Sequence, residues 1–123
     1  MSLETIPYEV KANEDWVDSL QLLHPAVGGA PAVPRDLTGS SFKAQFRTHP
    51  KGITVYLEAS TSNGRIQIGD DPLEGWIHWN VPRAVLGRIP PGEYVFDLVW
   101  TDADGAEDTI VEGPWVLKIG ITR

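Results

Sequence analysis

The chain has 123 residues and a net charge of −7, with an apolar content of 41%. This length suits one ordinary domain with a single core, and the apolar content argues against a disordered chain. The negative charge repels phosphate backbones and anionic lipid headgroups, so neither nucleic acid nor a membrane surface is expected as a partner.

The first 34 residues carry no targeting signal and little regular pattern. Residues 1–10 lack a basic start followed by an apolar stretch, so a signal peptide is not expected. No apolar run approaches the roughly 20 residues that cross a bilayer, so no transmembrane segment is expected. Residues 16–23 fit a strand or a helical turn equally well. Residues 24–34 contain three prolines and paired glycines, which predict a long exposed loop.

From residue 42 onward, apolar residues recur at every second position, the period of a strand with one buried face. The positions expected to face the core are Phe42, Ala44, Phe46, Ile53, Val55, Leu57, Ala59, Ile66, Ile68, Ile77, Trp79, Val81, Tyr94, Phe96, Leu98, Trp100, Trp115, Leu117, Ile119 and Ile121. The final strand is expected to start after Gly113 and Pro114, with residues 109–112 forming a separate return strand.

Turn residues separate these strands at the short spacing of hairpins, for example at 62–64, 69–72 and 102–105. A helix is tolerated only at 82–88, where Pro82 suits the first helical position. A parallel sheet needs crossover helices for which the chain has no room. The sequence therefore predicts an all-β, antiparallel β-sandwich with one short helix.

Residues 86–94 look like the approach to a tyrosine corner, in which a tyrosine at a strand start hydrogen-bonds to upstream backbone. Tyr94 would be that tyrosine. An ordinary core aromatic is the equal alternative.

No residue pattern predicts catalysis or a cofactor. His24, His49 and His78 lack a second ligand at metal spacing. The serines have no nucleophile elbow around them, and there is no phosphate-binding glycine loop. We therefore expect no enzyme activity, no metal and no cofactor.

Two acidic turns are candidate ligand or catalytic sites. Residues 102–105 resemble part of a calcium loop, but the later ligands are out of register, so a solvated turn is favoured. Asp70, Asp71 and Glu74 could act as acid and base only if a cleft held them apart. The turn residues around them favour exposed carboxylates instead.

Two strands are apolar on both faces, which is the most informative feature for function. A sandwich buries one face of each sheet, so a second apolar face needs a cover from a loop, the helix or another subunit. We interpret these outer faces as a protein–protein interface formed by Trp76, His78, Val95, Asp97 and Val99.

A carbohydrate-binding module is the alternative function. In that case exposed tryptophans would stack on sugars, with Trp76, Trp79, Trp100 and Trp115 as candidates. Trp100 and Trp115 continue apolar stripes, however, which favours core positions for both.

The chain resembles a group of small phage and prophage proteins. Residues 36–39 (DLTG) followed by 42–47 (FKAQFR) are similar to the opening of these proteins, and residues 89–98 (IPPGEYVFDL) and 102–105 (DADG) fit their later part. The resemblance is to the N-terminal domain of the phage baseplate upper protein and covers residues 35–123. Residues 13–16 depart from it, since relatives often have a Gly-Asp-Thr-like turn there.

The resemblance implies an immunoglobulin-like sandwich in a virion or tail assembly, with no catalytic residues. Residues 1–34 would add an N-terminal strand and loop to a main sandwich at 35–123, all in one domain. The expected partners are phage structural proteins, with a homo-oligomer as a further alternative. The expected location is the virion or the host cytoplasm.

Charged residues next to apolar strand positions suggest that ion pairs stabilise the fold. A buried carboxylate should be hydrogen-bonded or ion-paired. We therefore expect Arg47 or Arg35 to pair with Asp97 or Asp36 and to fix the long loop. The alternative is plain surface charge, worth at most about 1 kcal/mol per pair.

Overall fold

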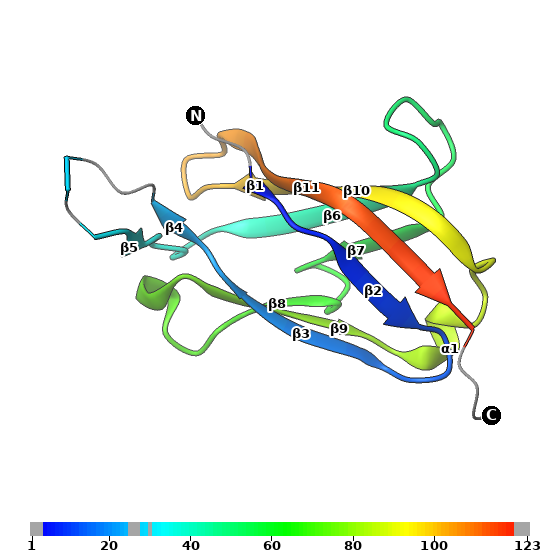
Figure 1. Cartoon of the computed structure of the whole chain (residues 1–123). Coiled ribbons are helices and arrows are strands. Elements are labelled where there is room, and N and C mark those ends of the chain that lie inside the picture. Colours follow the sequence, from blue (N-terminus) through cyan, green and yellow to red (C-terminus); the bar gives the residue numbers. More distant parts are fainter. Residues whose placement is uncertain (1–3, 25–27, 30, 120–123) are drawn as a thin grey trace.

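Alternating apolar side chains produce strands whose buried faces meet between two sheets (Figure 1). The computed structural model describes residues 4–24, 28–29 and 31–119. One sheet contains β1 (Glu4–Thr5), β2 (Tyr8–Lys11), β6 (Ser41–Arg47), β7 (Leu57–Ser60), β10 (Gly92–Thr101) and β11 (Glu107–Lys118). The facing sheet contains β3 (Trp16–Gln21), β8 (Ile66–Ile68) and β9 (Trp76–Val81).

Short elements complete the described part of the chain. They are the two-stranded ladder of β4 (Leu23–His24) and β5 (Val33–Pro34), the 3₁₀ helix η1 (Pro72–Glu74) and the helix α1 (Arg83–Leu86). None of the helices in the described residues is long and apolar enough to cross a membrane.

The strand order confirms the predicted all-β, immunoglobulin-like sandwich with one short α-helix. The larger sheet runs β1-β11-β10-β6-β7, with β2 following β1 along the same edge of β11, and the smaller sheet runs β3-β9-β8. All pairings are antiparallel except those of β1 and β2, which lie parallel to β11. This parallel edge was not predicted. It is possible because most of the chain lies between the paired segments and replaces a crossover helix.

The core is dominated by aromatic rings from both sheets. Trp16 on β3 stacks on Trp79 of β9 with ring centroids 4.8 Å apart, and Trp79 donates a 3.2 Å hydrogen bond from Nε1 to the Tyr8 hydroxyl on β2. Burial raises the pKa of Tyr8. This bond ties the two sheets together through the interior, where a hydrogen bond satisfies polar atoms that water cannot reach.

The predicted loop at 24–34 is wrong at its two ends. Leu23 pairs with Pro34 and His24 with Val33, while residues 25–27 and 30 lie outside the described residues. The ends meet because Leu22 is anchored to the fold. Its N–H donates to Gly75, and its carbonyl accepts from the N–H of Arg35, both at 2.8 Å.

The strand predicted at 53–59 begins only at Leu57. Ile53 is 97% exposed, and Val55 is also exposed. The Gly52 N–H donates a hydrogen bond to the His49 carbonyl and forms a turn. This turn directs the segment away from the sheet. At the chain's other end, Ile119 is exposed because β11 ends at Lys118, and Ile121 lies outside the described residues.

The break predicted at Gly113 and Pro114 is also wrong, because β11 runs through both. The edge strands explain why. β1 pairs with β11 as far as Glu112, and β2 pairs with β11 from Trp115 onward. Pro114, which has no N–H to donate, therefore lies in the gap between the two short edge strands. Gly113 has no side chain to collide with the chain that passes it, since a Cβ there would lie 2.3 Å from the Ile6 carbonyl oxygen.

Tyr94 forms the tyrosine corner that was one of two alternatives in the sequence. Its hydroxyl donates to the carbonyl of Pro90, four residues upstream, while its ring is buried. Its ring also contacts Tyr56, with centroids 5.3 Å apart. Burial, reinforced by nearby Tyr56, raises the pKa of Tyr94. Tyr94 is therefore both a core aromatic and a backbone clamp.

Tyr94→Phe is expected to lower the free energy of unfolding by about 1–2 kcal/mol, because it leaves the Pro90 carbonyl without its donor. Tyr56→Phe, at an exposed ring, should change it by less than about 0.5 kcal/mol. Urea unfolding measures both. The pKa of Tyr94 is raised by folding, so its protonated form is favoured in the native state. The difference between wild type and Tyr94→Phe should hold at neutral pH and shrink as pH rises through that pKa.

Gly113→Ala should cost about 2 kcal/mol or more, because the new Cβ must push the Ile6 backbone away from β11. Gly87→Ala is the matched control, since its Cβ would lie 3.3 Å from the Arg83 carbonyl oxygen, a tight approach but 1.0 Å longer than the 2.3 Å at Gly113. Thermal unfolding compares the two variants. Equal melting temperatures would contradict the close contact between Ile6 and β11.

Candidate functional site

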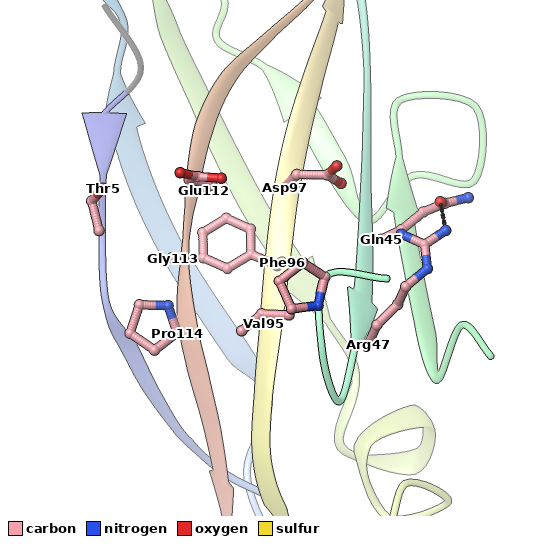
Figure 2. A pocket seen from close by; sticks show the side chains of 10 residues that line it. Thr5, Gln45, Arg47, Val95, Phe96, Asp97, Glu112, Gly113 and Pro114 are labelled. Atoms are coloured by element: carbon pink, nitrogen blue, oxygen red, sulfur yellow. Dashed lines mark hydrogen bonds between the residues drawn. The ribbon is translucent and has the colours of Figure 1, made fainter. Parts of the chain in front are cut away.

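The larger sheet has a hollow of about 340 Å³ on its outer face, opposite the core. Along β6 and β10, buried side chains that point into the core alternate with less buried ones that point the other way. These outward side chains form the surface of the hollow. Figure 2 shows the hollow from close by, with its floor across β6, β10 and β11. We call it the outer hollow; its lining residues are Thr5, Gln45, Arg47, Pro50, Val95, Phe96, Asp97, Glu112, Gly113 and Pro114.

Two carboxylates lie opposite each other at this surface. Asp97 on β10 is in register with Glu112 on β11, and Figure 2 shows them on neighbouring strands. Like charges in direct cross-strand register destabilise a sheet. Arg47 does not neutralise them, because it donates to the amide oxygen of Gln45. Within the described residues, neither carboxylate has an ion pair or a side-chain hydrogen bond.

An apolar loop stands at the rim of the outer hollow. Residues 48–56 connect β6 to β7, and Pro50 from this loop lines the hollow. Ile53 in the same loop is 97% exposed, and Tyr56 is 39% exposed. Pro50 thus brings the loop that carries the exposed Ile53 to the edge of the outer hollow.

Val99 lies further along the same outer face. It is in register with Lys43 on one side and Thr109 on the other. The predicted apolar face of β10 is therefore mixed, with valines alternating with charged and polar neighbours. Such mixtures are typical of interfaces that form and dissociate, since these are no more apolar than ordinary protein surface.

A second hollow, of about 460 Å³, lies on the outer side of the smaller sheet. We call it the Trp76 hollow; it is lined by Ser19, Gly69, Asp70, Asp71, Glu74, Trp76 and His78. Ser19 and His78 are paired across β3 and β9, with the serine hydroxyl 2.7 Å from His78 Nδ1. Asp71 accepts from the N–H of Leu73 and caps η1, so its carboxylate has a structural role.

The five predicted interface residues therefore belong to two surfaces. Trp76 and His78 are on β9 of the smaller sheet, while Val95, Asp97 and Val99 are on β10 of the larger one. Both sets point outward as alternation predicted, and all are at least partly exposed. The structure does not bring them together, because the core lies between the two sheets.

The tryptophans proposed as sugar platforms are mostly buried. Trp79 and Trp115 have no exposed surface. Trp100 is half-buried, donates to the Ser40 hydroxyl at 2.8 Å and is covered by the Arg35 guanidinium 5.3 Å from its ring. Trp76, at 36%, is the exposed one of the four. The carbohydrate alternative therefore depends on Trp76.

The proposed ion pairs do not form in the described structure. Arg47 bonds Gln45, Arg35 lies over Trp100, and Asp97 has no charged partner. Asp36 accepts from the N–H and hydroxyl of Thr38, and these bonds lower the pKa of Asp36. The ion-pair hypothesis assumed that these charged side chains are buried, but no charged side chain in the described residues is fully buried. Water can solvate these charges without an ion pair.

In the acidic turn at 102–105, the carboxylate of Asp102 accepts hydrogen bonds from the backbone of the turn itself. Asp102 Oδ1 accepts from the N–H groups of Asp104 and Ala106, at 2.9 and 3.0 Å. This is the hydrogen bonding of a turn in which an aspartate organises its own backbone. No group of three or more potential metal ligands is present among residues 4–24, 28–29 and 31–119.

Sequence reasoning missed Glu112, Pro114, Pro50 and Ile53 as surface-site residues. Glu112 becomes a neighbour of Asp97 only through strand register, for which a single sequence gives no signal. Ile53 was misassigned because it shares the two-residue period of the strand that follows. The glycine and proline just before it were the available signal for a loop.

No family model and no curated protein match the chain. Among solved structures it is similar to the PmoD soluble domain from Methylocystis sp., with 9% identity, a TM-score of 0.43 and coverage of 89% of this chain and 77% of that one. For CopC from Methylosinus trichosporium OB3b these values are 10%, 0.40, 98% and 90%. For AggA, the major subunit of aggregative adherence fimbriae type I from Escherichia coli, they are 12%, 0.37, 91% and 89%. Similarities this distant carry no argument about function.

Proposed function

We propose that this chain is a non-catalytic structural module of a phage or prophage particle, which acts by packing the outer face of its larger sheet against protein. The observation that carries this proposal is the outer hollow, where apolar floor residues lie beside two carboxylates that have no cationic partner within the described part of the chain. The phage setting rests on the resemblance of residues 35–123 to the baseplate upper protein.

The chemistry of the outer hollow supports packing rather than catalysis. Besides the two carboxylates, its lining offers the hydroxyl of Thr5 as a nucleophile, but it has no histidine or lysine to activate that hydroxyl. Val95 and Pro114 offer apolar contact area. A protein partner with a basic and an apolar side chain would complement both features.

The proposed place of this chain in a phage particle can be tested by density-gradient sedimentation of particles from the host that carries the gene. Immunoblotting is expected to find the chain in the particle fraction after prophage induction. Val95→Asp at the hollow's floor should shift it to the unassembled fraction, because a further acidic group cannot be desolvated there. Val17→Asp, at an exposed position on the smaller sheet, is the control that should stay with the particles. Absence of the wild-type chain from particles would contradict the proposal.

A carbohydrate-binding role is the second candidate, and the Trp76 hollow favours it. An exposed indole beside carboxylates and His78 is an arrangement that can stack on a sugar ring and hydrogen-bond its hydroxyls. This candidate predicts that soluble polysaccharides change the tryptophan fluorescence. It also predicts that Trp76→Ala abolishes the change while Leu73→Ala, at an exposed apolar side chain outside the hollow's lining, retains it. No response across a polysaccharide panel would eliminate it.

A further inference from the structure

We propose that Asn63 is a modification site, at which spontaneous deamidation removes a side-chain cover from the open edge of β7. The inference goes beyond the packing function, because neither Asn63 nor the glycine that follows it lines the outer hollow. It is carried by the hydrogen bonds of the Asn63 amide and by the chemistry of an asparagine that precedes a glycine.

β7 lies at one end of the larger sheet, and among the described residues β6 is its partner strand. The Thr61 N–H donates to the Phe42 carbonyl on β6, which fixes the alternation of this ladder. Backbone groups of an antiparallel strand point toward the partner strand at every second residue, so those of Glu58 and Ser60 point away from β6. Such an edge is a template for another strand unless something covers it.

The Asn63 side chain covers this edge. Its Oδ1 accepts from the Ser60 N–H and its Nδ2 donates to the Glu58 carbonyl, both at 3.0 Å. A further strand would use the same two groups of β7, so the amide occupies the place of such a strand. Oδ1 also accepts from the Arg65 N–H at 3.0 Å, and the Arg65 guanidinium donates to the Glu58 carbonyl at 2.9 Å. These bonds hold the turn between β7 and β8 on the edge of β7.

An asparagine that precedes a glycine deamidates readily, because glycine has no side chain to hinder its own nitrogen. Gly64 has a left-handed φ of +78°, a conformation that favours glycine. In the reaction the Gly64 nitrogen loses its proton to solvent and attacks Asn63 Cγ. The new N–Cγ bond replaces the Cγ–Nδ2 bond, and Nδ2 takes a proton from solvent and leaves as ammonia. Water then opens the succinimide ring to give aspartate or isoaspartate.

The hydrogen bonds of the amide delay this reaction, and its product cannot remake them all. Three bonds hold the Asn63 side chain in place, so Cγ reaches the Gly64 nitrogen only when the turn opens. The carboxylate that forms has no N–H for the Glu58 carbonyl, and its oxygen would face the carbonyl oxygen. Isoaspartate also lengthens the backbone by one methylene group, which displaces the turn. Deamidation therefore leaves the edge of β7 uncovered.

Peptide mapping by mass spectrometry tests the site, with wild type incubated both folded and in urea at the same mildly alkaline pH. Asn63 should be modified in both states, at a rate at least about tenfold lower in the folded chain. Ser60→Ala removes the hydroxyl that accepts from the Asn63 N–H at 3.1 Å, so it should raise the folded rate by about threefold or more. Ser62→Ala is the matched control, because the Ser62 hydroxyl makes no hydrogen bond within the described part of the chain.

Hydrogen exchange measured by NMR tests whether modification uncovers the edge. The modified chain carries one more negative charge, so anion exchange separates it from fresh protein. Its Ser60 N–H should exchange at least about tenfold faster than in fresh protein. The N–H of Phe96, which lies between two partner strands, should keep its rate. Equal deamidation rates in the folded and unfolded chains, a folded Ser60→Ala chain that stays unmodified, or an unchanged Ser60 N–H after modification would each overturn the inference.

Discussion

Aromatic contact between the two sheets is the interaction on which the rest of the molecule depends. Trp16 and Trp79 stack within the smaller sheet, and Trp79 reaches across to the hydroxyl of Tyr8 at the edge of the larger one. Phe46 and Trp115 pack beside them with centroids 4.8 Å apart. Because these rings fill the interior, every second residue of β6 and β10 must point to the other side. The outer face is thus a consequence of how the core is packed.

The edge strands show how this packing constrains the outer surface. β1 and β2 reach β11 in parallel, and the chain between them passes Gly113 so closely that a side chain does not fit. This passage keeps β11 continuous through Pro114 and holds Glu112 opposite Asp97. The proposed binding surface therefore depends on a contact of the N-terminal segment.

The outer hollow and the Trp76 hollow differ in what they offer a partner. The outer hollow has an apolar floor and two carboxylates that form no ion pair within the described residues. In the Trp76 hollow, Ser19 and His78 already bond each other and Asp71 caps a helix. Polar groups that are already satisfied gain less from a ligand than groups that are not. This difference is why we assign the packing function to the larger sheet.

The Pro-Pro-Gly turn before Tyr94 left the tyrosine corner as one of two alternatives in the sequence. Most of the strands after residue 41, with their inward and outward faces, could be predicted from the sequence, because a two-residue period acts within a few residues. Phe42, Ala44 and Phe46 were placed correctly for this reason. The exposed position of Ile53 and the cross-strand register of Asp97 with Glu112 became visible in the tertiary structure. Strand register and sheet pairing depend on contacts between residues far apart in the chain, and local periodicity carries no information about them.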